Sequence, residues 1–194
     1  MAALPKLSGA PETLASHLEA TPDAAAIVRV APDAPEALER LVAAGELQGA
    51  IRLCAHALPP REAVWWACMC ADHTVTDDLP SADREVRVAA EAWVRRPSDT
   101  TRRSAMTLAQ AAGLVSPEAW TGVAAFWTGG SMAPEGQPAV EPAPGLLGTA
   151  VAGSVLLASV RAHPERQPNR LRRFLDSARD IAAGGPGRIA QPDD

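Results

Sequence analysis

The sequence predicts an all-α, single-domain bundle of about eight or nine mostly antiparallel helices, with a proline-rich connector before the last two. Three observations lead to this fold class. Alanine supplies 41 of the 194 residues, and the 18 leucines equal valine and isoleucine together, which favours closely packed helices. The chain has no tyrosine and two phenylalanines, so side chains that cover a sheet are scarce. Apolar residues also recur at helical spacing between short breaks.

Residues 1–34 are expected to form an N-terminal tail, a short helix and a linker. The helix is predicted over residues 11–20, where Leu14 and Leu18 share one face. Residues 25–30, AAIVRV, are the most strand-like stretch of the chain, and a Pro-Asp pair stands on each side of them. Because a single short strand cannot build a sheet, this stretch is predicted to be an extended linker.

A helical domain is predicted over residues 35–184. Proline or a small polar residue stands near the start of several of its helices, with Ser81 expected to be an N-cap, and glycine follows several helix ends. The predicted helices cover residues 35–45, 46–58, 60–73, 82–96, 99–112, 117–128, 145–162 and 168–183.

Three segments have an unusual composition. Residues 131–144 hold four prolines and no helical period, which indicates an extended connector. The glycine-rich end of the last helix predicts a flexible C-terminal tail over residues 185–194. Residues 145–160 carry no charge, but they are shorter than the roughly 20 apolar residues of a membrane span. We therefore expect a buried core helix there and no membrane span.

Charge and cysteine content narrow the function classes. The net charge of −5 argues against a dedicated nucleic-acid-binding protein, which needs an excess of cations. Three cysteines form no disulfide framework, and the N-terminal residues carry proline and charge where a signal peptide needs an apolar run. These features predict a cytoplasmic protein, and no cofactor-binding motif is present in the sequence.

The helix predicted over residues 60–73 is the first candidate for a site. Trp65 and Trp66 lie about 100° apart on a helix, so the two can face different neighbours. Packing in the core explains both, whereas a binding role would present one tryptophan, with Arg61 nearby, to a protein partner. We name Arg61, Trp65 and Trp66 as candidate partner-binding residues.

A second candidate surface is the arginine-rich last helix. Arg170, Arg172 and Arg173 bring local positive charge to an acidic protein, which suits either a solvated helix face or docking to an acidic partner. We include these three arginines among the partner-binding candidates.

The alternative to protein binding is a small-ligand site or an enzyme pocket around Trp65, Trp66, Cys70 and His73. Cys70 and His73 can share a helix face, which is the minimum for a thiol activated by an imidazole. A metal site is not predicted, because Cys68 and Cys70 point about 200° apart on a helix.

Three stretches resemble an uncharacterised bacterial family, a domain of unknown function of about this length. They are Leu58–Cys68 (LPPREAVWWAC), Ala124–Pro134 (AAFWTGGSMAP) and Pro144–Ser159 (PGLLGTAVAGSVLLAS), and the similarity covers roughly residues 50–183. Members of the family are associated with type VI secretion gene clusters. The resemblance implies an accessory role in type VI secretion and supplies no catalytic residues.

These observations together predict a non-enzymatic helical adaptor or chaperone-like accessory protein. Its expected partner is a protein, either a component or a cargo of a secretion system.

Overall fold

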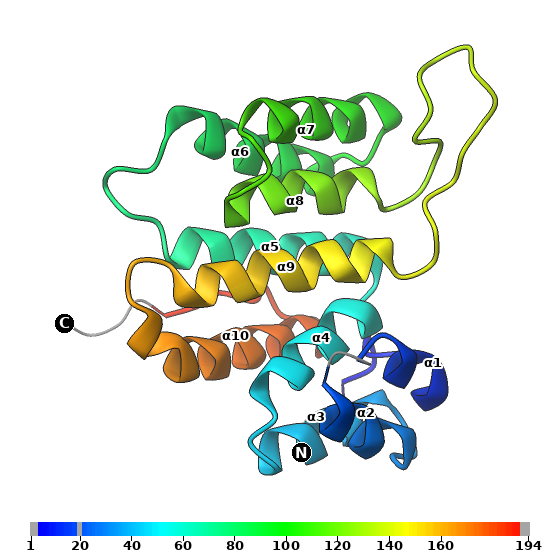
Figure 1. The fold of residues 1–194 in the computed structure, drawn as a ribbon, viewed down its shortest axis with the longest axis vertical. Coiled ribbons are helices and arrows are strands. Elements are labelled where there is room, and N and C mark those ends of the chain that lie inside the picture. The colour runs from blue at the N-terminus through cyan, green and yellow to red at the C-terminus, as the bar shows by residue number, and fades with distance from the viewer. Residues whose placement is uncertain (1–3, 19–20, 191–194) are drawn as a thin grey trace.

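A computed structural model shows the fold of the chain, and the structure describes residues 4–18 and 21–190 (Figure 1). Within these ranges the chain is all-α, which confirms the predicted single-domain bundle. The described residues form ten α-helices and one short 3-10 helix: α1 Pro11–Ser16, α2 Pro22–Arg29, α3 Ala34–Ala43, α4 Leu47–Ala57, α5 Pro60–His73, α6 Ser81–Arg95, α7 Asp99–Ala111, α8 Pro117–Phe126, α9 Leu146–Val160, η1 Pro164–Arg166 and α10 Gln167–Ala182.

The helices lie in three tiers (Figure 1). Helices α6, α7 and α8 pack against one another at one end, α5 and α9 form the middle, and α4 and α10 lie beyond them with α1, α2 and α3 at their side. Because α9 contacts α4, α5, α8 and α10, most of its surface is covered by other helices. This central position explains why residues 145–160 are apolar on almost every side of the helix.

The predicted core helix at residues 145–160 is confirmed as α9. Among the described residues no single helix is long and apolar enough to cross a membrane. Only α9 and the segment Pro164–Ala182 taken together reach that length and hydropathy, and a bend of 115° separates the two.

Helix boundaries follow the predicted start and stop signals closely. Helix α5 has the predicted bounds, and Ser98 and Ser116 cap α7 and α8 by accepting backbone N–H groups three residues on. The assignment of Ser81 as an N-cap is wrong, since Pro80 holds that position and Ser81 begins α6. Helix α8 ends at Phe126, two residues before the predicted end.

The predicted linker over residues 25–30 is wrong, because it forms most of α2. Proline at the first helical position and an acid, Asp23, in the first turn start the helix. Its buried side packs close to α4, where a Cβ on Gly49 would lie 2.5 Å from the Cβ of Ala24. Valine and isoleucine favour strands only weakly against such packing, so the tertiary contact decides the helix. Helices α1 and α2 thus add side chains to the same core as the rest of the bundle.

The connector over residues 131–144 forms no helix and projects from the body of the protein (Figure 1). Its start is fixed where Arg102 and Arg103 both donate hydrogen bonds to the Ser131 carbonyl, at 2.8 and 2.9 Å. Its two arms are joined by a hydrogen bond of 2.7 Å from the Met132 N–H to the Val140 carbonyl.

Candidate functional site

The two tryptophans of α5 face different surroundings. Trp66 is fully buried, and its Nε1 donates a hydrogen bond of 2.9 Å to the Phe174 carbonyl of α10. Trp65 is only partly buried, and its Nε1 donates a hydrogen bond of 2.8 Å to the Pro186 carbonyl. These tertiary contacts place Trp66 in the core and leave Trp65 partly exposed at the surface.

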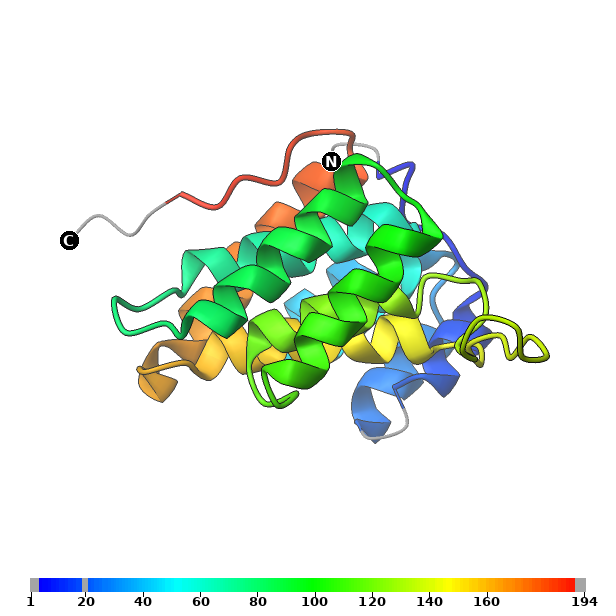
Figure 2. The same ribbon diagram turned by 90° about the horizontal axis from the view of Figure 1, so that it is seen from above.

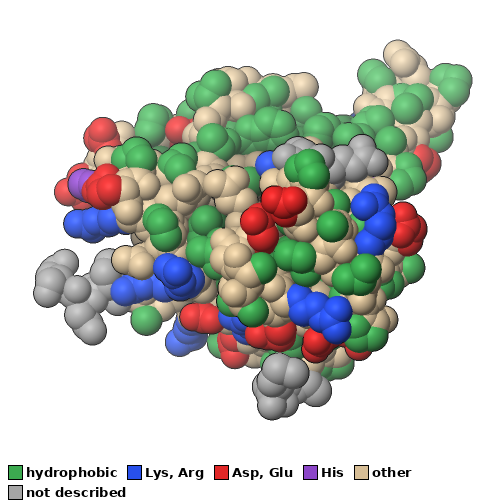
Figure 3. Space-filling model, turned by 60° about the horizontal axis from the view of Figure 1, so that its bottom comes forward, with side chains coloured by type: hydrophobic (Ala, Val, Ile, Leu, Met, Phe, Trp, Pro, Cys, Tyr) green, Lys and Arg blue, Asp and Glu red, His purple; other side chains and the backbone are tan. Residues whose placement is uncertain are grey.

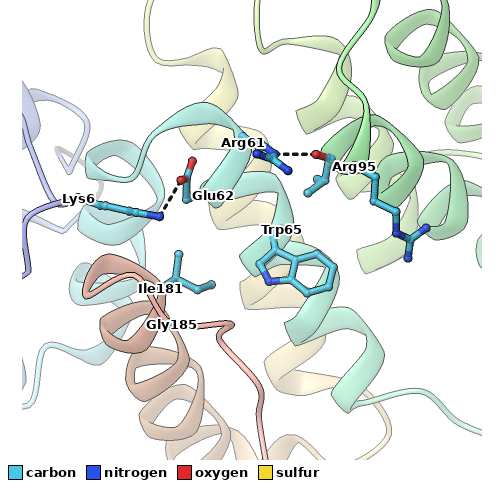
Figure 4. A pocket seen from close by; sticks show the side chains of 8 residues that line it. Lys6, Arg61, Glu62, Trp65, Arg95, Ile181 and Gly185 are labelled. Atoms are coloured by element: carbon cyan, nitrogen blue, oxygen red, sulfur yellow. Dashed lines mark hydrogen bonds and ion pairs between the residues drawn. The ribbon is translucent and has the colours of Figure 1, made fainter.

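Trp65 lines a pocket of about 290 Å³ where α5, the end of α6 and the end of α10 meet (Figure 4). Three basic side chains line the pocket with the indole ring, together with one acid and two aliphatic side chains. The lining consists of Lys6, Arg61, Glu62, Trp65, Val94, Arg95, Ile181 and Gly185. Trp66, Cys70 and His73 are not part of this lining.

The charges of the pocket are only partly balanced. Lys6 pairs with Glu62 at 2.9 Å, and Arg95 pairs with Glu91 at 2.8 Å. Although partial burial by itself raises the pKa of Glu62, the hydrogen bond and the charge of Lys6 hold it below its ordinary value of 4.5. Glu62 is therefore ionised at neutral pH and compensates Lys6.

Arg61 supplies the uncompensated charge of the pocket. Its Nε donates a hydrogen bond of 2.6 Å to the Val94 carbonyl, which fixes the guanidinium in the lining that it shares with Trp65 (Figure 4). Among the described residues no acid pairs with it. The two Nη groups retain donors that suit a carboxylate.

Residues 185–190 run back along α10 rather than leaving the protein as the predicted flexible tail, and the rest of that predicted tail, 191–194, lies outside the described residues (Figure 2). Apart from the bond to Trp65, the Ser177 hydroxyl donates to the Gly187 carbonyl at 2.6 Å. The glycine-rich composition predicts that the backbone of this segment is flexible, because glycine adopts many backbone conformations. The hydrogen bonds from Trp65 and Ser177 hold the segment in one conformation.

The arginines predicted on the last helix lie near its start, away from the Trp65 pocket. Arg172 and Arg173 are exposed, but Arg170 is partly buried and donates to the carbonyls of Ser159 and Arg161 at 3.2 and 2.6 Å. Arg170 thus satisfies carbonyl groups at the end of α9. Figure 3 shows basic side chains gathered at this end of the molecule.

The three cysteines are fully buried. Loss of water raises the pKa of Cys54 and of Cys68 to about 12, and it raises that of Cys70 well above the ordinary value. A thiol in such surroundings stays protonated and unreactive. The described residues contain no group of three or more side chains that could hold a metal ion.

A stacked histidine pair is a feature that the sequence analysis missed. The rings of His17 and His56 lie parallel, with centroids 4.1 Å apart, beside the start of α9. A Cβ on Gly148 would lie 2.2 Å from Nδ1 of His56, so a glycine is required there. The glycines at the start of α9 were the available signal, but nothing in the sequence says which side chain they accommodate.

We expect stability to fall in acid because of His56. Burial lowers its pKa from 6.5 to about 4, and repulsion from His17 and Arg52 acts in the same direction. As the pH falls, the His56 ring is therefore protonated in the unfolded chain near pH 6.5, before it is protonated in the folded protein near pH 4. The contribution of the neutral ring to the free energy of unfolding is full above about pH 6.5 and is lost as the pH falls to about 4. The loss is about 1–3 kcal/mol, measured by urea unfolding at each pH.

The matched controls are two single replacements. The His56→Gln variant should lose this part of the pH dependence, whereas His163→Gln, which changes an exposed ring, should keep it. Equal slopes between pH 6.5 and 4 in wild type and His56→Gln would contradict the assignment.

Comparison with known proteins gives one family. A family of unknown function, DUF6931, matches residues 37–182. No curated protein and no solved structure matches the chain. Helix α5 and the pocket residues from Arg61 to Ile181 lie within the match, while Lys6 and Gly185 lie outside it. The predicted resemblance to a domain of unknown function is confirmed. Since the match spans well over half of the sequence, the chain belongs to the DUF6931 family of unknown function.

Proposed function

We propose that this protein is a non-enzymatic helical adaptor or chaperone-like accessory protein that binds another protein through the Trp65 pocket. One observation carries the proposal: a partly exposed tryptophan lies beside the Arg61 guanidinium, which has no acidic partner among the described residues. Tryptophan and arginine are the residues most enriched among interface hot spots. A partner that places a carboxylate on Arg61 and an apolar group on Trp65 fits both.

The start of α10 supports an acidic partner. The first turn of this helix has no acid, although the helix dipole favours negative charge there. Instead the surface carries Arg166, Arg172 and Arg173, all exposed. Of these three, Arg166 is the N-cap of α10, with Glu165 of η1 directly before it, and Arg172 and Arg173 lie in the second turn. An acidic partner would compensate this local excess of positive charge.

The setting that we propose is type VI secretion, in the cytoplasm, with a secretion-system component or a cargo protein as the partner. The support for this setting is the family resemblance of residues 58–68, 124–134 and 144–159.

The geometry favours an adaptor over the alternative of an enzyme centred on Trp65, Trp66, Cys70 and His73. Trp66 and Cys70 are fully buried, and the raised pKa of Cys70 removes its thiolate at neutral pH. Only Trp65 of these four side chains lines the pocket.

The test is affinity purification of the tagged protein from its native host, followed by mass spectrometry. Wild type should capture secretion components, and Arg61→Glu should reduce their recovery about tenfold or more, since losing a charged hot-spot contact costs at least 2 kcal/mol or so. The matched control is Arg84→Glu, the same charge reversal at an exposed position of α6.

Circular dichroism should show that both variants are folded. Recovery of no secretion component by wild type would contradict the type VI setting. Equal recovery of the same protein by wild type and Arg61→Glu would contradict the pocket as the binding site.

A further inference from the structure

The segment over residues 185–190 is bound through its backbone by side chains of two helices. Each of the four contacts joins a side chain of α5 or α10 to a main-chain atom of the segment. They are Trp65 Nε1 to the Pro186 carbonyl at 2.8 Å, the Gly187 N–H to Asp180 Oδ2 at 2.7 Å, the Ser177 hydroxyl to the Gly187 carbonyl at 2.6 Å, and Arg173 Nη1 to the Ala190 carbonyl at 3.3 Å. This is how a protein holds an extended peptide without reading most of its side chains.

The side chains of the segment contribute one apolar anchor. Ile189 is partly buried against the core of the bundle, whereas Arg188 and Ala190 are exposed. The Arg188 side chain makes no hydrogen bond or ion pair to any residue that the structure describes. We call the surface that the four side chains binding the segment's backbone form beside the Trp65 pocket the groove between α5 and α10. The bundle accommodates an apolar side chain at position 189 and leaves position 188 free.

Two glycines of the segment leave no room for a Cβ while the side chains around them keep their present positions. Gly187 has a φ of +70°, and a Cβ there would lie 2.4 Å from Cγ1 of Ile181. A Cβ on Gly185 would lie 2.2 Å from Oδ1 of Asp180. The groove thus accepts a Gly-x-Gly-x-apolar pattern.

The family match covers the groove but not the segment over residues 185–190 that lies in it. Helix α5 and α10, which supply all four side chains, lie within the family match, and the match ends at residue 182, before the segment begins. The segment also lies along the outside of the bundle rather than within it (Figure 2). The binding groove is a property of the bundle, and the segment is one peptide that fills it.

We infer that the groove between α5 and α10 is a binding site for an extended peptide of a partner protein, carrying a Gly-x-Gly-x-apolar sequence, and that residues 185–190 occupy it until such a peptide displaces them. This inference rests on the proposed function, because Trp65 and Gly185 belong both to the groove and to the pocket. The segment then regulates access to the adaptor's own site.

The experiment measures binding of a synthetic peptide, GGPGRIA, the sequence of residues 184–190, to the full chain by calorimetry. Gly187→Val and Ile189→Asp each release the chain's own segment without changing the side chains of the groove. Both variants should bind the peptide at least about tenfold more tightly than wild type, because the segment no longer competes. Arg188→Ala, which changes an exposed side chain of the segment, should bind as weakly as wild type.

Two further arms test how the peptide is recognised. A peptide with valine in place of the glycine at position 187 should fail to bind the opened variants. Adding Trp65→Phe to Ile189→Asp should weaken binding about three- to tenfold, the value of one hydrogen bond.

Circular dichroism identifies the variants that are folded. If Gly187→Val does not fold, the peptide-binding measurement is made with Ile189→Asp alone. Equal affinity of the peptide, including no binding, for wild type and for a folded Ile189→Asp variant overturns the inference, as does tight binding of the valine peptide. Because this measurement uses no cellular partner, it is independent of the capture experiment with Arg61→Glu. The peptide experiment can therefore contradict the peptide-binding groove without contradicting the adaptor function, and the capture experiment can contradict the adaptor function without contradicting the groove.

Discussion

Trp66→Ala is expected to lower the free energy of unfolding by about 3–5 kcal/mol, the cost of removing a large aromatic side chain from a core. Trp66 is among the largest fully buried side chains of the protein, and it joins α5 to α10 both by packing and by the hydrogen bond to the Phe174 carbonyl. Alanine leaves a cavity between the two helices and removes the second hydrogen bond to the Phe174 carbonyl, which as an interior residue of α10 also accepts one within the helix.

The neighbouring tryptophan is the matched control. Trp65→Ala removes a partly exposed ring and the hydrogen bond to Pro186, which we expect to cost only about 1–2 kcal/mol. Urea unfolding followed by circular dichroism measures both values. A smaller loss for Trp66→Ala than for Trp65→Ala would contradict the assignment of Trp66 to the core. Loss of partner capture in a folded Trp65→Ala variant is expected in addition.

Breaking the ion pair between Glu118 and Arg161 is expected to destabilise the protein by about 3–5 kcal/mol, as for other buried pairs that lose one partner. Glu118 lies in the first turn of α8 and is fully buried, and Arg161 follows the last residue of α9. Arg161 Nη1 donates to Glu118 Oε1 at 2.9 Å, and Arg161 Nη2 donates to Glu118 Oε2. The same guanidinium reaches the Ala71 carbonyl of α5 at 3.4 Å.

Replacing both Glu118 and Arg161 separates the free energy of the ion pair from the cost of burying a charge without its partner. Glu118→Met or Arg161→Met alone leaves one charge without its partner, whereas the double replacement leaves two apolar side chains that can pack together. The double variant should be more stable than either single variant, and a double-mutant cycle in urea gives the coupling free energy. Additive losses would show that the two charges do not stabilise each other. The exposed pair of Arg40 and Glu36 is the control, with about 0.3–0.5 kcal/mol expected for a surface pair at this spacing.

The sequence by itself determined the helical class and most helix boundaries. Local signals were sufficient where proline or serine begins a helix and the stripe of apolar residues is continuous, as in α5, α7 and α10. They failed for α2, where alanine, valine and isoleucine read as an extended stretch and the contact with Gly49 of α4 favours the helix. Helix periodicity also separated Trp65 from Trp66 by angle, without showing which one faces the core.

Only the tertiary structure decided the composition of the candidate site. The pocket brings together Lys6, Arg61, Arg95 and Ile181, which are far apart in the sequence. Tertiary packing also turned Arg170 inward to the end of α9 and placed residues 185–190 on Trp65. Periodicity fixes the face of a helix on which a side chain lies, but the charge and space around that face depend on which helices pack against it. That packing is a long-range property, which no local pattern in this sequence contains.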